Sequence, residues 1–188
     1  MSDDQGAAPL GGENLFDALC ALQVRFEEHA AGLPQRDDLP DIWAGVLFRV
    51  GEFSLLAPQE EIGEILEVPR EVTLVPGTKD WVFGVANSRG TLLPMFDLRA
   101  YLFGSAMSRS ARNRVLVVRR DESPVGLLVN DVTGIRHFDA SSQHQQVEEL
   151  PDTLQPFVIG SFVLGGRSYP VFSVRQMTLD PKFSLIGA

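Results

Sequence analysis

From residue 41 onward, the chain is a series of short β-branched segments separated by Gly- and Pro-containing turns. Such segments, joined by hairpin-length gaps, favour a β-sandwich or small β-barrels over a parallel sheet with crossover helices. In this region only residues 97–103 and 173–179 have the pattern of short helices. The predicted strands are residues 42–50, 52–57, 62–68, 82–88, 91–96, 114–119, 125–129, 133–138, 157–164 and 168–172.

One part of this pattern occurs twice, at a spacing of 76 residues. Each copy predicts a strand, a Gly turn, a strand that contains Pro, and a short helix, so we expect two similar β units. The matching residues are Gly84, Gly90, Pro94, Phe96 and Arg99 in the first copy and Gly160, Gly166, Pro170, Phe172 and Arg175 in the second.

The two copies also differ in an informative way. Asn87, Arg89 and Asp97 stand in the first copy where the second has Val163, Gly165 and Ser173. Because the fold alone would preserve the glycines, we expect these three polar residues to have a local role.

The first 40 residues differ from the rest in composition and carry eight acids and two bases. We expect a disordered tail over 1–12, because this stretch is small, acidic and Gly-rich. Residues 13–40 predict an amphipathic helix followed by a linker, and the helix either packs on the following domain or docks a partner. A domain over 41–180 and a C-terminal tail over 181–188 complete the prediction. The apolar face of the predicted helix consists of Leu15, Leu19, Leu22 and Phe26.

Charge and composition exclude several classes of protein. The net charge of −9 argues against general binding to nucleic acid or to anionic membranes. No apolar stretch approaches the roughly 18 residues needed to cross a bilayer, and the N-terminus lacks the pattern of a signal peptide. Cys20 is the single cysteine, which excludes a disulfide framework. We therefore expect a cytoplasmic protein without membrane insertion.

Catalytic patterns are missing from the sequence. It contains no nucleophile elbow, dinucleotide-binding or phosphate-binding glycine motif, and no zinc-protease motif. We expect no catalytic residue, no cofactor and no metal. The alternative is a small β-barrel enzyme or ligand-binding protein. Such a protein would use either the loop between His137 and His144 or the arginine cluster that runs from Arg109 to Arg120.

Three blocks, in order along the chain, resemble the CheW family of chemotaxis coupling proteins. The most specific block is residues 82–98, which contain Gly84-Val85-Ala86-Asn87-Ser88-Arg89-Gly90, then Pro94, then Asp97-Leu98. The early block is Ile62-Gly63-Glu64-Ile65. A later block, residues 125–132, has Asn130 where the family usually has Asp. Short segments at 30–34 and 154–157 resemble, more narrowly, the PilI members of type IV pilus (twitching motility) systems.

This resemblance implies a mainly β fold of two small five-stranded β-barrels packed side by side. It also implies a non-enzymatic adaptor at membrane-associated receptor arrays. Its partners would be the cytoplasmic tip of a methyl-accepting chemoreceptor and the regulatory domain of a CheA-type histidine kinase. By position, Glu64 and Arg89 would form an ion pair that shapes the groove facing the receptor. The predicted groove residues are Ile62, Glu64, Val85, Asn87, Arg89 and Gly90.

Overall fold

The computed structural model of the chain describes residues 41–120, 123–145 and 149–185. The predicted tail, amphipathic helix and linker of the first 40 residues lie outside these ranges. The described residues form ten strands and three short α-helices, with 3-10 turns between them. The strands are β1 (Ile42–Val50), β2 (Phe53–Pro58), β3 (Ile62–Glu67), β4 (Val82–Ser88), β5 (Thr91–Asp97), β6 (Arg114–Arg120), β7 (Ser123–Val129), β8 (Asp131–Asp139), β9 (Val158–Leu164) and β10 (Arg167–Phe172). The helices are α2 (Leu98–Phe103), α3 (Val174–Leu179) and α4 (Pro181–Ser184).

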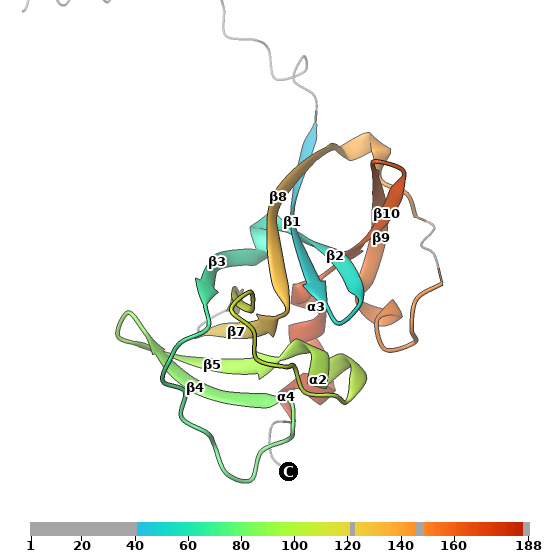
Figure 1. The fold of residues 1–188 in the computed structure, drawn as a ribbon. Helices are drawn as coiled ribbons and strands as arrows, with labels where there is room; N and C mark the ends of the chain where they lie inside the picture. The colour runs from blue at the N-terminus through green and yellow to red at the C-terminus, as the bar shows by residue number, and fades with distance from the viewer. Residues whose placement is uncertain (1–40, 121–122, 146–148, 186–188) are drawn as a thin grey trace, which may run out of the picture. The chain divides into compact units, whose positions relative to one another are not determined.

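The strands form two five-stranded sheets, which confirms the predicted fold class. The first sheet has the order β8-β1-β2-β10-β9 and the second has the order β3-β6-β7-β5-β4. The chain leaves the first sheet after the β1–β2 hairpin, builds the second sheet from β3 to β7, and returns with β8 (Figure 1). Each sheet therefore has the same arrangement of strands, and neither sheet is formed by one half of the chain alone.

The repeat predicted at a spacing of 76 residues is present in the structure. Strand β4 and helix α2 recur, residue for residue, as β9 and α3. The backbone contact that leads into each helix recurs as well. The Asp97 amide donates to the Trp81 carbonyl at 2.8 Å, and the Ser173 amide donates to the Phe157 carbonyl at the same distance. The two copies are thus structurally equivalent units.

A short backbone bridge links the two edges of each sheet. In the second sheet, the segment after β3 pairs with β4 through Thr73 and Val85; in the first, the segment after β8 pairs with β9 through His144 and Ser161. A β-carbon at Gly84 would lie 2.6 Å from the Thr73 carbonyl oxygen, so this close approach requires glycine. Gly160 occupies the same position in the other sheet. These bridges curl each sheet toward a small barrel.

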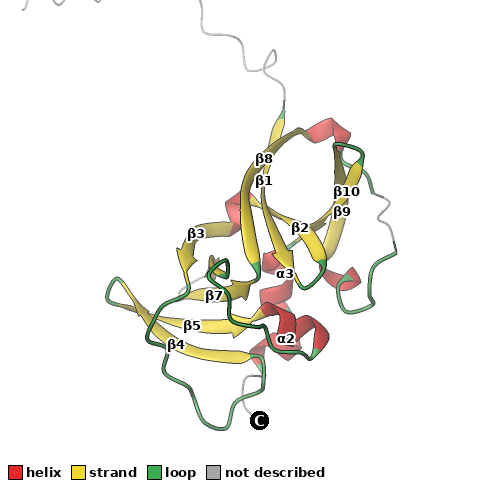
Figure 2. Cartoon of the chain, viewed as in Figure 1, coloured by secondary structure: helices red, strands yellow, loops and turns green. Residues whose placement is uncertain are grey.

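Neighbouring residues within a strand face different hydrophobic clusters. Phe48 and Leu55 face a large core that also contains residues of the second sheet and of all three helices, whereas Leu47 and Leu56 face a smaller core inside the first sheet. Figure 2 shows α2 and α3 near the place where the two sheets meet. Because both faces of these strands are buried, their sequences are continuous apolar runs rather than alternating ones.

Residues 181–184, within the predicted C-terminal tail, form a short helix. Helix α4 begins at Pro181, and the Asp180 carboxylate caps it by accepting the Lys182 amide at 2.6 Å. Phe183 is buried, with its ring centroid 4.6 Å from that of Phe96 and 5.6 Å from that of Trp81. Four residues are too few to show helical periodicity, so the sequence alone does not indicate this helix. No described helix is long and apolar enough to span a membrane.

Candidate protein-binding site

The β4–β5 hairpin ends in a tight turn formed by Arg89 and Gly90. Both residues have positive φ, at +51° and +84°, as a two-residue hairpin turn of type I′ requires. The Asn87 side chain stabilises the turn, since its Oδ1 accepts the Gly90 amide at 2.8 Å. The local role predicted for Asn87 is therefore to hold the turn that presents Arg89.

Arg89 is the one residue other than glycine with positive φ in the described part of the chain. The equivalent turn in the first sheet uses Gly165 and Gly166, at +59° and +77°. A side chain in this conformation costs about 1–2 kcal/mol relative to glycine. Backbone strain of this kind concentrates at functional positions, so the arginine side chain marks this turn as a candidate site.

The Arg89 side chain forms an ion pair with Glu64. Arg89 Nη2 lies 2.5 Å from Glu64 Oε1, and the side chains are 78% and 34% exposed respectively. Glu64 lies on β3, which forms one edge of the second sheet, and Arg89 follows β4, which forms the other edge. The pair therefore links the same two edges as the backbone bridge. At this exposure it contributes at most about 1 kcal/mol to stability.

Beside the hairpin lies a shallow cavity of about 550 Å³. Val85 and Asn87 line it together with Leu92 and Pro69. Leu92 is strongly exposed, at 71%, so the cavity has an apolar wall that faces solvent. An exposed apolar patch next to a charged turn has the composition of a protein-binding surface.

The predicted groove residues separate into groups in the structure. Glu64 and Arg89 are joined by their ion pair, while Val85 and Asn87 line the cavity next to them. Ile62 is partly buried against the large core and is not among the residues that line this cavity. A register shift between Ile62 and Glu64 separates the two along β3.

Three exposed apolar residues, Leu92, Leu74 and Val75, are not among the predicted site residues. Alternation along β5 is the signal that would have identified the first: Leu93 is buried in the core of the second sheet, which leaves Leu92 on the outer face. The other two belong to the connection between β3 and β4, which has no periodicity to interpret.

Within the described ranges, His137 and His144 do not form a site with the acidic residues near them. His137 is exposed on β8, and His144 contacts β9 through its backbone. The Asp139 carboxylate accepts hydrogen bonds from the hydroxyl and the backbone amide of Ser141, at 2.6 and 2.9 Å. These hydrogen bonds lower the pKa of Asp139. Among the described side chains, no three His, Cys, Asp or Glu residues could together hold a metal ion.

The arginine cluster is divided between different roles. Arg114 donates to the carbonyl oxygens of Ala111 and Asn113, at 2.9 and 2.8 Å, and so stabilises the loop before β6. Arg109 lies in that loop and lines a second cavity. The side chains of Arg119 and Arg120 are outside the described part of the structure.

Asn130, which departs from the family pattern, has a structural role. Its side-chain Oδ1 accepts the Gly51 backbone amide at 2.6 Å, and the Asn130 backbone amide donates to the Arg49 carbonyl at 2.9 Å. These two hydrogen bonds attach the β7–β8 corner to the β1–β2 turn. An amide side chain is sufficient for this contact, because only an acceptor is used.

Comparison with known proteins identifies the class to which this fold belongs. Residues 44–181 match the family described as the CheW-like domain. The chain is therefore a member of the CheW-like family.

Individual relatives agree with this assignment. The chain is 40% identical over 147 residues to Protein PilI of Pseudomonas aeruginosa, which covers 78% of this chain and 82% of that protein. It is 29% identical over 133 residues to Chemotaxis protein CheW of Helicobacter pylori, covering 71% and 77% of the two chains. The crystal structure of scaffolding protein TtCheW from Thermoanaerobacter tengcongensis superposes with a TM-score of 0.63 at 20% identity, over 76% of this chain and 90% of that one. That similarity supports the fold.

Proposed function

We propose that this protein is a non-enzymatic adaptor that couples a chemoreceptor to a CheA-type histidine kinase. The strained Arg89 at the tip of the β4–β5 hairpin is the observation that carries the proposal. A chain under no functional constraint at this turn would use glycine, as the equivalent turn does. The similarity to proteins named PilI and CheW supports the same reading. The likeness to PilI favours a chemosensory pathway that controls type IV pili.

The receptor tip is proposed to bind the side of the second sheet that carries Glu64, Arg89 and the cavity lined by Val85 and Asn87. The ion pair fixes the direction of the arginine, and the exposed Leu92 next to it supplies apolar contact area. An arginine beside an apolar wall is the composition typical of residues that dominate binding energy. Ile62 and Gly90 would act by shaping the strand and the turn.

An adaptor must hold both partners at once, so the two binding surfaces cannot coincide. We therefore propose that the kinase regulatory domain binds elsewhere on the double-sheet domain. The protein would then act at the receptor arrays on the cytoplasmic side of the membrane, without entering the bilayer.

The test is a comparison of two affinities for the variant Arg89→Ala. Binding to a purified receptor cytoplasmic fragment should weaken by about tenfold or more, which corresponds to about 1.4 kcal/mol. Binding to the kinase regulatory domain should stay within about twofold of wild type, well below that threshold. Arg112→Ala is the matched control, because Arg112 is also an exposed arginine but lies in the loop before β6.

Two results would contradict the proposal. Equal loss of both affinities together with a lowered melting temperature would mean that Arg89 is only structural. Unchanged affinity for the receptor fragment would remove the hairpin from the binding surface.

A further inference from the structure

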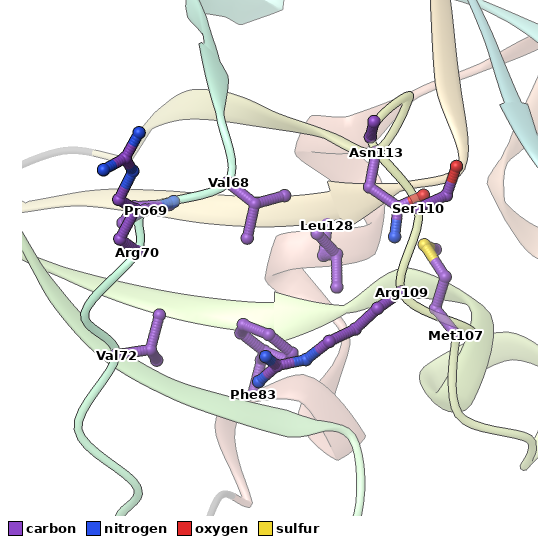
Figure 3. A pocket seen from close by; sticks show the side chains of 11 residues that line it. Val68, Pro69, Arg70, Val72, Phe83, Met107, Arg109, Ser110, Asn113 and Leu128 are labelled. Atoms are coloured by element: carbon purple, nitrogen blue, oxygen red, sulfur yellow. The ribbon is translucent and has the colours of Figure 1, made fainter.

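A second cavity, of about 540 Å³, opens between the segment that follows β3 and the loop that precedes β6 (Figure 3). Its volume lies within the range of small-molecule sites. Val68, Phe83, Met107 and Leu128 give it an apolar lining that is continuous with the core of the second sheet. It includes neither residue of the Glu64–Arg89 ion pair, but it adjoins the cavity beside the β4–β5 hairpin, with which it shares Pro69 and Arg70.

A buried side chain in the wall of this cavity has an unused hydrogen-bond acceptor. Asn113 is 4% exposed, and its Nδ2 donates to the Ser108 carbonyl at 3.0 Å. Its Oδ1 is buried and has no hydrogen-bond partner among the described residues. The amide cannot be turned round, because that would bring Oδ1 against the Ser108 carbonyl oxygen. This acceptor is closed off from solvent, so a ligand with an N–H or O–H group would satisfy it only if the wall opens around Oδ1.

Two arginines stand at the opening. In Figure 3 the Arg109 side chain extends across the cavity, and the Arg70 guanidinium points outward at its edge. Both residues are exposed, and neither makes a hydrogen bond or an ion pair within the described part of the chain. Arg70 and Arg109 thus place two cations at one opening of a chain whose net charge is −9. Guanidinium groups of this kind bind carboxylate, sulfonate or phosphate oxygens.

We propose that this cavity binds a small organic anion with an apolar body and one hydrogen-bond donor. The apolar body would occupy the space between Phe83 and Leu128, the donor would reach Asn113 Oδ1, and the acidic group would meet Arg109. Each of the three ligand features corresponds to a different part of the wall. This site does not depend on the adaptor function proposed above, and it involves no chemical step.

The probe is 8-anilinonaphthalene-1-sulfonate, which combines an apolar ring system, one N–H donor and one sulfonate. Fluorescence titration of the full chain should show saturable binding of one molecule. Arg109→Gln should weaken this binding by about tenfold, as expected when a charged hydrogen-bond partner is removed. Arg112→Gln is the matched control, since Arg112 belongs to the same loop but is not among the residues lining the cavity, and it should leave binding unchanged.

A second ligand and a second method separate this site from general hydrophobic binding. N-phenyl-1-naphthylamine lacks the sulfonate, so its affinity should be the same for wild type and for Arg109→Gln. In amide NMR spectra, 8-anilinonaphthalene-1-sulfonate should shift the side-chain amide of Asn113 and the backbone amide of Met107. The proposal is overturned if binding does not saturate, if the shifts lie elsewhere, or if Arg112→Gln weakens binding as much as Arg109→Gln. Retained receptor and kinase binding by Arg109→Gln would show that the adaptor surface is a different one.

Discussion

Replacing Arg89 by glycine should leave the fold about as stable as wild type, although the replacement removes an ion pair. The left-handed backbone at Arg89 costs about 1–2 kcal/mol for an L-residue. Glycine removes that cost but loses about 0.4–1 kcal/mol through the greater freedom of the unfolded chain. The exposed ion pair with Glu64 contributes about 0.2–1 kcal/mol. Arg89→Ala loses the ion pair and keeps the strain, so we expect Arg89→Gly to be about 1 kcal/mol more stable than Arg89→Ala.

The first sheet provides the reverse experiment. Gly165 has φ of +59°, and a β-carbon built there meets no atom within 4 Å. Gly165→Ala therefore introduces the backbone strain without any clash, and it should destabilise the protein by about 1 kcal/mol.

Equilibrium urea unfolding of the three variants measures both effects, with equal m-values as the check that the unfolding transition is unchanged. For a chain of this size, 1 kcal/mol corresponds to about 2–4 °C in Tm. The reasoning fails if Arg89→Gly is no more stable than Arg89→Ala, or if Gly165→Ala has no effect. In either case the turn conformation would not explain why Arg89 stands where its counterpart is glycine.

Three further predictions concern the core. Phe183→Ala should destabilise the protein by about 3–5 kcal/mol in urea unfolding, because the ring is fully buried among aromatic side chains. A loss below about 1 kcal/mol would mean that residues 181–184 are a tail that does not contribute to the core. Asp97→Ala should lose about 2–4 kcal/mol, because the carboxylate caps α2 and also accepts the Met107 amide at 2.7 Å. Asp97→Ser keeps the helix cap and removes only the hydrogen bond to Met107, so it should lose less stability than Asp97→Ala. Equal losses for the two variants would mean that the Met107 contact alone accounts for the effect. Burial, reinforced by the negative charge of Asp180, raises the pKa of Tyr101. As the pH rises above about 10, the unfolded chain loses the Tyr101 proton before the folded protein does. The free energy of unfolding should therefore fall with rising pH in wild type, and it should fall less in Tyr101→Phe. Parallel pH profiles of the two proteins would refute this prediction.

Most of the strands could be predicted from the sequence, because their ends are marked by Gly, Pro and changes in polarity. Strands β1 and β4 have the predicted bounds, and the bounds of the other strands differ by one or two residues. The repeat was predictable for a related reason: glycine is required at Gly84 and Gly160 by a close backbone approach. Because the same close approach occurs in both copies, glycine stands at the equivalent position of each, and the repeat is visible in the sequence.

The exchange of strands between the sheets could not be predicted in the same way. Strand β3 pairs with β6, and β8 pairs with β1, at sequence separations that no local pattern specifies. The cavity next to Asn113 was hidden for a similar reason. Its wall combines residues from β3–β4, from β7 and from the loop before β6, and Asn113 is an ordinary loop residue in sequence. Only the fold brings these residues together.

The duplicated hairpins explain how one small fold can present two chemically different surfaces. The β4–β5 and β9–β10 hairpins have equivalent strands and the same turn conformation, so their tips differ in side chains rather than in shape. The first tip carries Asn87 and Arg89, and Arg89 is paired with Glu64. The second tip carries the exposed apolar residues Val163 and Leu164 and has a glycine turn. The large core contains residues of both sheets, so the two tips belong to one continuously packed domain. The adaptor function proposed above would need a common scaffold with two unlike surfaces, and the two hairpins provide such a pair.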